Sequence, residues 1–187
     1  MKPSVPASVG ADDVVVLVTP GDTALGVAPK LAAHREGCLH RAVSVVLFDD
    51  GGRLLLQRRA DEKYHSGGLW SNTACGHPRP GESVEDAGRR RLLDELGIDG
   101  CELTRVDQFL YFADLGGGLV EHELDHVVVG RWNGEATPNP REVSETKWIG
   151  HDDLLAALVE EPGLFTAWLR SVVYHAYRAG GIASTPR

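Results

Sequence analysis

Three histidines and two glutamates in this sequence could together hold one divalent metal ion. They are His34, His40, His77, Glu121 and Glu123. Glu121 and Glu123 lie two apart in a predicted strand, so their side chains point to the same face of the sheet. Their carboxylates would offset the charge of a bound cation; a plain solvent-facing polar edge is the alternative. Nitrogen and oxygen ligands together suit zinc, manganese or iron better than magnesium. Four other histidines are expected to be ordinary surface or core residues: His122, His126, His151 and His175.

Cys75 is a candidate proton-transfer residue. It lies two positions before His77, in the segment Asn-Thr-Ala-Cys-Gly-His-Pro at 72–78. Gly76 and Pro78 predict an irregular loop, in which a thiol can face a pocket. A nearby metal ion, or nearby arginine and lysine, would favour the thiolate below the usual thiol pKa of about 8.5. The alternative is a small, inert core residue, which is the usual role of a free cysteine.

Arg91 and Glu95 lie four positions apart, and therefore on one face of a predicted helix. The simplest interpretation is a surface ion pair, which contributes roughly tenths of a kcal/mol. In the functional interpretation, Glu95 holds a hard cation such as magnesium, and Arg91 holds a phosphate that the cation also contacts. Arg59 and Lys63 lie in a polar loop and could complete this anion site, although cations in loops are usually only solvated.

Trp168 has Phe165 three positions before it and Val172 four after it, which is the spacing of a buried helix stripe. An aromatic face over a small pocket is the alternative. Such a face could stabilise a cation by about 2 kcal/mol or more where water is excluded.

A sheet and a few helices must position these residues. Apolar runs predict strands at 14–18, 25–27, 42–48, 53–57, 70–73, 106–113, 119–132 and 146–149. A helical turn is predicted at 30–34, and helices at 83–96, 152–160 and 164–178. Ser83 can cap the first of these helices and Gly97 can end it. The pattern is that of an α/β (α+β) fold in which a mixed sheet is sandwiched between helices.

Length and composition fit one compact domain. A chain of 187 residues can bury roughly 70% of the surface that its unfolded form exposes. We expect residues 13–180 to form this domain, with flexible tails at 1–12 and 181–187. The net charge of −8 argues against nucleic acid as the main ligand, because phosphate contacts need a basic face.

The cysteines and the beginning of the chain favour a cytoplasmic protein. Cys38, Cys75 and Cys101 have no paired spacing and are expected to be free thiols. The first residues lack the basic and apolar regions of a signal peptide, and the apolar run at 14–18 is too short to span a membrane. We therefore expect no association with membranes.

Residues 76–98 resemble the Nudix signature. That signature reads Gly, five residues, Glu, seven residues, Arg-Glu, an apolar residue, any residue, Glu-Glu, any residue, Gly and an apolar residue. Arg91 stands where the signature has the glutamate that follows arginine, which is a main metal ligand in Nudix hydrolases. A cation at this position indicates chemistry other than hydrolysis.

The chain resembles, more specifically, the type I isopentenyl-diphosphate isomerases, a family with a Nudix fold. The matching stretches are 30–34, 39–42, 69–78, 81–83, 94–97, 109–111 and 121–126, and the resemblance covers residues 14–178. Its most specific parts are Asn-Thr-x-Cys-x-His-Pro and Glu-x-Glu. Two features differ: the interval between His34 and His40 is one residue shorter than in bacterial members, and 65–68 lacks a tryptophan that some members have.

The resemblance implies two metal sites and a set of catalytic residues. Zinc or manganese would bind His34, His40, His77, Glu121 and Glu123. Magnesium would bind Glu95 and the diphosphate of a small-molecule substrate, which would also contact Lys30, Arg59, Lys63 and Arg91. Cys75 and Glu123 would transfer protons, assisted by Tyr111, and Trp168 would face the reacting carbon skeleton. We expect a monomer or a weak homodimer.

The implied reaction converts isopentenyl diphosphate to dimethylallyl diphosphate, by protonation at C4 and deprotonation at C2 through a tertiary carbocation. One alternative is a Nudix pyrophosphohydrolase acting on a nucleoside diphosphate derivative, which would need neither Cys75 nor Trp168. The other is a non-enzymatic Nudix module, in which no thiol and carboxylate need to face one another.

Overall fold

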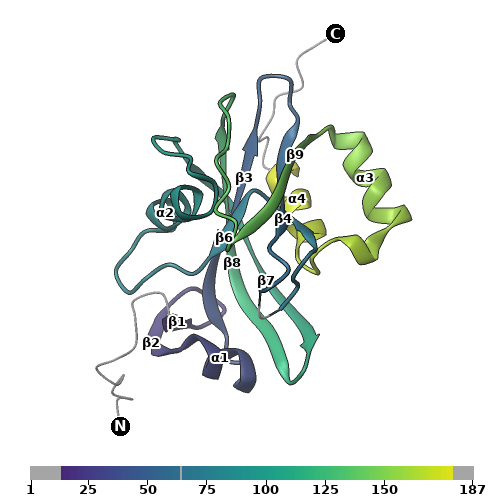
Figure 1. The fold of residues 1–187 in the computed structure, drawn as a ribbon. Helices are drawn as coiled ribbons and strands as arrows, with labels where there is room; N and C mark the ends of the chain where they lie inside the picture. Colours follow the sequence, from purple (N-terminus) through teal and green to yellow (C-terminus); the bar gives the residue numbers. More distant parts are fainter. Residues whose placement is uncertain (1–13, 64, 179–187) are drawn as a thin grey trace.

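The computed structural model describes residues 14–63 and 65–178, which form nine strands, four α-helices and one 3-10 helix, η2 (Figure 1). The strands are β1 Val14–Val18, β2 Ala24–Pro29, β3 His40–Phe48, β4 Leu54–Arg59, β5 Trp70–Ser71, β6 Ala74–Gly76, β7 Thr104–Gly116, β8 Leu119–Arg131 and β9 Val143–Ile149. The helices are α1 Lys30–Glu36, α2 Val84–Leu96, α3 His151–Glu160, η2 Pro162–Leu164 and α4 Leu169–Arg178. None of the described helices is long and apolar enough to cross a membrane. The predicted tails at 1–12 and 181–187 lie outside the described residues.

Strand β3 is the centre of a mixed sheet. It pairs antiparallel with β4 and β6 and parallel with β8. Strand β4 also pairs with β5 and β9, and β8 forms a long antiparallel hairpin with β7. The ribbon of β1 and β2 joins the sheet where Leu17 pairs with His40. The predicted mixed sheet is therefore confirmed.

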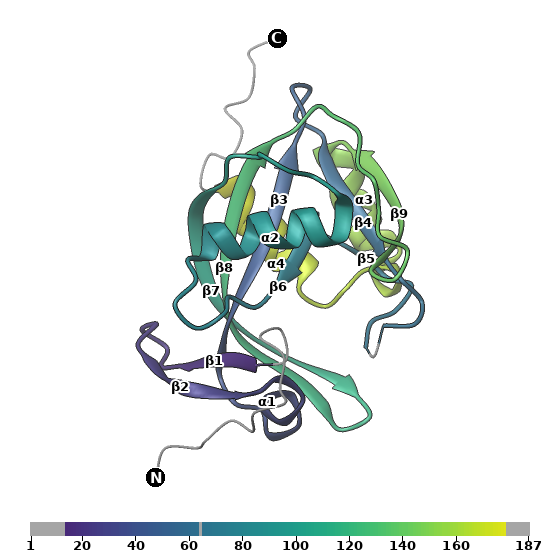
Figure 2. The same cartoon turned by 60° about the vertical axis from the view of Figure 1, so that its left-hand side comes forward.

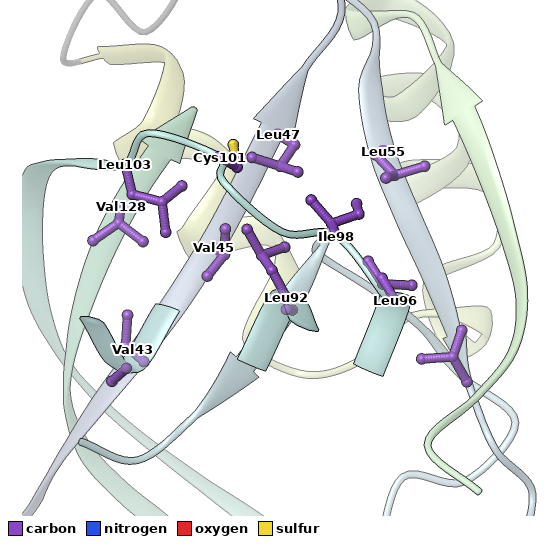
Figure 3. Close-up of a cluster of buried hydrophobic side chains, with 13 residues drawn as sticks. Val43, Val45, Leu47, Leu55, Leu92, Leu96, Ile98, Cys101, Leu103 and Val128 are labelled. Carbon is purple, nitrogen blue, oxygen red and sulfur yellow. The ribbon is translucent and has the colours of Figure 1, made fainter. Parts of the chain in front are cut away.

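Helices cover both faces of this sheet. In Figure 2, α2 lies in front of β3 and α4 lies behind it. Val43, Val45 and Leu47 of β3 share a core cluster with Leu92 and Leu96 of α2 (Figure 3). The cluster on the opposite face includes Val46, Phe48, Leu169, Val172 and Val173. Burial on both faces explains the continuous apolar run of β3, and it confirms the sandwich of a sheet between helices.

Helix α2 begins and ends where its sequence predicts. Ser83 is the N-cap, and its Oγ accepts a hydrogen bond from the backbone N of Asp86 at 3.1 Å. Gly97 ends the helix with φ of 64°, a left-handed conformation that glycine adopts without strain. Gly88 allows a close approach to the sheet, because a Cβ there would lie 2.8 Å from Leu103 and 3.2 Å from Val45.

The helix predicted at 164–178 begins only at Leu169. Phe165 is extended, with φ of −120° and ψ of 151°, and forms a parallel bridge with Trp70. The spacing of Phe165, Trp168 and Val172 is therefore not a helix stripe, because the first two residues precede the helix. Pairing with the end of a strand overrides the local helical pattern here.

The strand predicted at 70–73 ends at Ser71 as β5, and a second short strand, β6, begins only at Ala74. Between them, Asn72 Nδ2 donates to the carbonyl of Val45 at 3.1 Å, and Thr73 Oγ1 donates to the carbonyl of Leu55 at 2.7 Å. Side-chain hydrogen bonds to the backbone compete with strand pairing. Cys75 consequently lies in a strand and not in the irregular loop that we predicted.

Candidate active site

The sheet gathers most of the candidate metal ligands. Glu121 and Glu123 lie two apart on β8 and share one face, as predicted. The parallel pairing of β3 with β8 sets His40 opposite Glu123. His77 follows β6, the antiparallel neighbour of β3 on its other side. Three separate segments therefore converge on one point of the sheet.

His34 reaches the same point from α1. The helix ends at Glu36, and Gly37 reverses the chain with φ of 65°. The ring centroids of His34 and His40 are 4.9 Å apart, and those of His40 and His77 are 5.0 Å apart. The short interval between His34 and His40 does not keep His34 away from the other ligands.

The distances suit a single metal ion. One ligand atom from each of His34, His40, His77 and Glu123 lies within 4.8 Å of the others. Glu123 Oε1 is 3.0 Å from His77 Nε2 and 3.4 Å from His40 Nε2. Glu121 Oε2 lies 3.1 Å from His34 Nε2. The structure thus brings together all five residues of the predicted site.

The orientation of the rings also fits a metal. Nδ1 of His34 lies 2.7 Å from the carbonyl of Lys30, and Nδ1 of His40 lies 2.8 Å from the carbonyl of Cys38. A carbonyl accepts only from a protonated nitrogen, so a neutral ring turns the lone pair of Nε2 toward the centre. Among the described residues, the buried atoms His40 Nε2 and Glu121 Oε2 make no hydrogen bond. A divalent cation would satisfy both atoms.

Two imidazoles at the site are held neutral by their surroundings. Burial, and then the charge of Lys30, lower the pKa of His77 well below its usual value. The neutral ring is the form that binds metals. Burial, and then Arg59, lower the pKa of His65 to about 4, and His65 Nε2 lies 3.6 Å from Glu121 Oε1. Sequence analysis missed His65, because the loop between β4 and β5 has no periodic pattern.

A third carboxyl group lies on the same face of β8. Asp125 is buried and accepts a hydrogen bond from Ser44 Oγ at 2.7 Å. Burial, and then the charge of Glu123, raise the pKa of Asp125 well above its usual value, which favours the neutral acid. Sequence analysis missed this residue too, although the two-residue spacing from Glu123 was a usable signal.

A cavity of about 210 Å³ connects the candidate metal site to a cluster of cations. Its walls include the two proton-transfer candidates, Cys75 and Glu123. They also include Trp168 and the four predicted phosphate-binding residues, Lys30, Arg59, Lys63 and Arg91. Ten of the predicted site residues therefore line one space, whereas His34, His40 and Tyr111 are not among the residues that line it.

Cys75 faces this cavity from β6, where it pairs with Ser44 of β3. Burial raises the pKa of Cys75 to about 12, although Arg59, whose Nη1 lies 3.9 Å from the sulfur, acts in the opposite direction. The expectation of a thiolate is therefore wrong for the protein without bound metal. The group is a neutral thiol, which can donate a proton.

Trp168 and Tyr111 are held close to the two candidate proton-transfer residues. The indole nitrogen of Trp168 donates to Ser71 Oγ and Asn72 Oδ1, both at 3.1 Å, which fixes the ring beside the cavity. Tyr111 pairs with Glu123 across the β7–β8 hairpin, and its ring centroid is 6.5 Å from that of Trp168. Burial raises the pKa of Tyr111, so its hydroxyl stays protonated.

At the cationic end, Arg91 and Glu95 are paired. Arg91 Nη2 lies 2.7 Å from Glu95 Oε1, and Glu95 Oε2 accepts from Gln57 Nε2 at 2.7 Å. Glu142, directly before β9, contacts Lys63 Nζ and lies 3.1 Å from Arg91 Nη2. Sequence analysis missed Glu142, because no motif surrounds it.

Lys30 and Arg59 complete the cationic end of the cavity. Burial, and then the charges of Lys63 and Arg91, lower the pKa of Lys30. Arg59 is the last residue of β4 and not a loop residue as predicted, and its Nε donates to the carbonyl of Ser66 in the following loop at 3.2 Å. Cations that repel one another in a partly buried space favour a bound anion.

Comparison with known proteins agrees with this fold and site. The NUDIX domain profile matches residues 39–169. The chain is 49% identical to isopentenyl-diphosphate Delta-isomerase 2 of Aromatoleum aromaticum, over 84% of this chain and 83% of that protein. It is 48% identical to isopentenyl-diphosphate Delta-isomerase of Burkholderia multivorans, over 88% of this chain and 93% of that protein. The chain therefore belongs to the Nudix family and, within it, to the isopentenyl-diphosphate Delta-isomerases.

Solved structures share the fold at lower sequence identity. Protein DR0079 from Deinococcus radiodurans superimposes with a TM-score of 0.73 at 23% identity, covering 88% of this chain and 99% of that one. The MutT protein from Methanosarcina mazei superimposes with a TM-score of 0.61 at 20% identity, covering 77% and 96% of the two chains. At these identities the likeness concerns the architecture alone.

Proposed function

We propose that this protein converts isopentenyl diphosphate to dimethylallyl diphosphate, a step in the supply of isoprenoid precursors. The observation that carries the proposal is that a thiol, Cys75, and a carboxylate, Glu123, both line one small cavity with a cationic end. Relatives that bear the name isopentenyl-diphosphate Delta-isomerase match over most of the chain, which supports the same substrate.

The reaction moves a double bond from C3–C4 to C2–C3, so one proton is added at C4 and another is removed from C2. Two groups, Cys75 and Glu123, can do this without carrying a single proton across the alkene. Whichever residue donates in the forward direction accepts in the reverse direction. Tyr111, a neutral phenol that pairs with Glu123 across the hairpin, assists at the carboxylate.

The tertiary carbocation between the two steps must be kept from water, which would trap it as an alcohol. Trp168 is fixed by its two hydrogen bonds and lines the cavity, so its ring can face the reacting carbons. An aromatic face stabilises a cation by about 2 kcal/mol or more when water is excluded. This is the role that we assign to Trp168.

The diphosphate would bind at the cationic end, where Lys30, Arg59, Lys63 and Arg91 hold it and so orient a very small hydrocarbon tail. We assign zinc or manganese to His34, His40, His77, Glu121 and Glu123, and magnesium to Glu95. When bound, these cations would supply positive charge that fixes Glu123 and offsets the diphosphate.

The hydrolase alternative is disfavoured by Arg91, whose guanidinium is paired with Glu95 and Glu142 at the position where Nudix hydrolases have a ligating carboxylate. A cytoplasmic location, a monomer or weak homodimer, and the domain limits 13–180 stay predictions from the sequence.

The proposal is tested by incubating the protein with isopentenyl diphosphate and magnesium in deuterated water, followed by NMR. We expect dimethylallyl diphosphate, with deuterium in the methyl group that derives from C4 and no release of phosphate. A folded, metal-loaded sample that exchanges no deuterium, but releases phosphate from a nucleoside diphosphate derivative, would establish the hydrolase instead.

A further inference from the structure

Glu142 forms ion pairs with two of the cations that line the cavity. Its Oε2 contacts Lys63 Nζ and also lies 3.1 Å from Arg91 Nη2. Burial acts against a charge on Glu142, but Lys63 and Arg91 together outweigh burial and lower the pKa of the carboxyl group. In the protein without ligand, an internal carboxylate therefore holds two of the residues that we assign to the diphosphate.

The two carboxylates at this end differ in how firmly they are held. Glu95 uses both oxygens, one for Arg91 and the other for Gln57, and its side chain is 5% exposed. Both ion pairs of Glu142 involve one oxygen, and its side chain is 26% exposed. Glu142 can therefore leave the cations by a side-chain rotation, whereas Glu95 is fixed in the wall.

The charges that line the cavity explain why it matters that Glu142 can move and Glu95 cannot. Lys30, Arg59, Lys63 and Arg91 carry positive charge into the cationic end of the cavity, and Glu95 and Glu142 offset part of it. A bare diphosphate must displace Glu142 and then lie beside two carboxylates of its own sign. Like charges brought together in this way discriminate against a ligand. A diphosphate that carries magnesium avoids most of this repulsion, because magnesium binds carboxylates and phosphates together.

We propose that Glu142 is a specificity-determining residue: it competes with the diphosphate for Lys63 and Arg91, and so makes the cavity select the magnesium form of the ligand. The inference rests on the proposed function for the class of ligand. Glu142 and Glu95 have different tasks. Glu142 leaves Lys63 and Arg91 when the ligand binds, whereas Glu95 stays in place.

The test is calorimetric titration with pyrophosphate, in magnesium-free buffer and again with magnesium, of the parent protein and the Glu142→Gln variant. Glu145→Gln is the matched control, because it removes one negative charge from an exposed position three residues along the chain. Loss of a competing carboxylate should tighten the binding of magnesium-free pyrophosphate about tenfold, which corresponds to about 1.4 kcal/mol. With magnesium, the parent and Glu142→Gln should differ by much less.

Two results would overturn the inference. The first is that Glu142→Gln binds magnesium-free pyrophosphate no more tightly than Glu145→Gln does. The second is that Glu142→Gln no longer binds magnesium pyrophosphate, which would mean that Glu142 is needed in the bound state. Glu142→Ala repeats the test if the glutamine variant does not fold. Isomerase turnover is measured on the same parent sample. If the parent isomerises but Glu142→Gln does not bind magnesium-free pyrophosphate more tightly, only the role of Glu142 is contradicted. If the parent shows no turnover but Glu142→Gln does bind more tightly, only the proposed function is contradicted.

Discussion

At Cys75, burial and charge act in opposite directions. Arg59 beside the sulfur favours the thiolate, but burial has the larger effect and raises the pKa to about 12. A residue that is to protonate an alkene must carry a proton at neutral pH, and this environment keeps it there. The same surroundings would make a poor nucleophile, since only the thiolate attacks efficiently.

Replacement of Cys75 by alanine should abolish turnover and leave the fold intact. General acid–base groups contribute about 10²–10⁴-fold to rates, so we expect kcat to fall by at least about 10²-fold. Steady-state kinetics and circular dichroism measure the two effects. Cys38→Ala is the control, because it removes a thiol outside the cavity lining. Activity of Cys75→Ala within about tenfold of the parent would contradict the assigned role.

The raised pKa of Cys75 predicts a pH dependence of its chemical reactivity. In chelator-treated protein, alkylation of Cys75 should stay slow at pH 7–9 and accelerate only as the pH approaches about 12, because the thiolate is the reactive form. Peptide mass spectrometry after timed treatment with iodoacetamide measures the rate. A rate that levels off below pH 9 would mean that the thiolate already predominates there.

The proposed function gives Glu123 two roles, proton transfer and metal binding, and its Oε1 lies close to both His40 and His77. Glu123→Gln should therefore lose bound metal as well as turnover, since a neutral amide neither balances the charge of the cation nor accepts a proton. Elemental analysis and kinetics measure the two losses. Glu135→Gln, at an exposed position, is the control. A Glu123→Gln variant with full metal content and full activity would disprove both roles.

At the scale of elements, α2 links the core to the site. Leu92 and Leu96 pack against β3, and the same helix carries Arg91 and Glu95 into the cavity. The loop before the helix is fixed as well, because Arg90 Nη2 donates to the carbonyl of His77 at 3.1 Å. The packing of one helix therefore positions both ends of the cavity.

Gly88→Val should weaken this packing. A Cβ at Gly88 would lie 2.8 Å from Leu103 Cδ1, and the added methyl groups must displace side chains of the sheet. Overpacking of this kind costs about 1–3 kcal/mol, which urea denaturation would measure as a lower free energy of unfolding. Gly163→Val is the control, because a Cβ at Gly163 meets no atom within 4 Å. Equal stability of the two variants would show that α2 has room to shift.

At the scale of the whole molecule, the candidate metal site joins α1, β3, β8 and the segment after β6. A ligand that binds only the folded state stabilises it, by about 2.7 kcal/mol at a concentration of 100 times its Kd. Removal of metal with a chelator should therefore lower Tm by about 5–10 °C. Differential scanning calorimetry measures the change, and the Glu123→Gln variant should show little of it. An unchanged Tm in the parent would mean that no metal contributes to its stability.

Local patterns in the sequence predicted most elements and singled out many of the residues that the structure brings together. The limits of α2 followed from Ser83 and Gly97, and the shared face of Glu121 and Glu123 followed from the two-residue repeat of a strand. These features depend on neighbours within a few positions, which the sequence displays directly. The specific stretches around Cys75 and Glu123 then indicated the family.

Tertiary structure alone decided how these residues act on one another. The pairing of β3 with β6 and β8 brings Cys75 and Glu123 to one cavity, and burial there keeps Cys75 protonated. The extended Phe165 and the contacts of Glu142 likewise depend on partners distant in sequence. No local pattern specifies such long-range contacts, because burial and charge at each residue arise only when separate segments pack together.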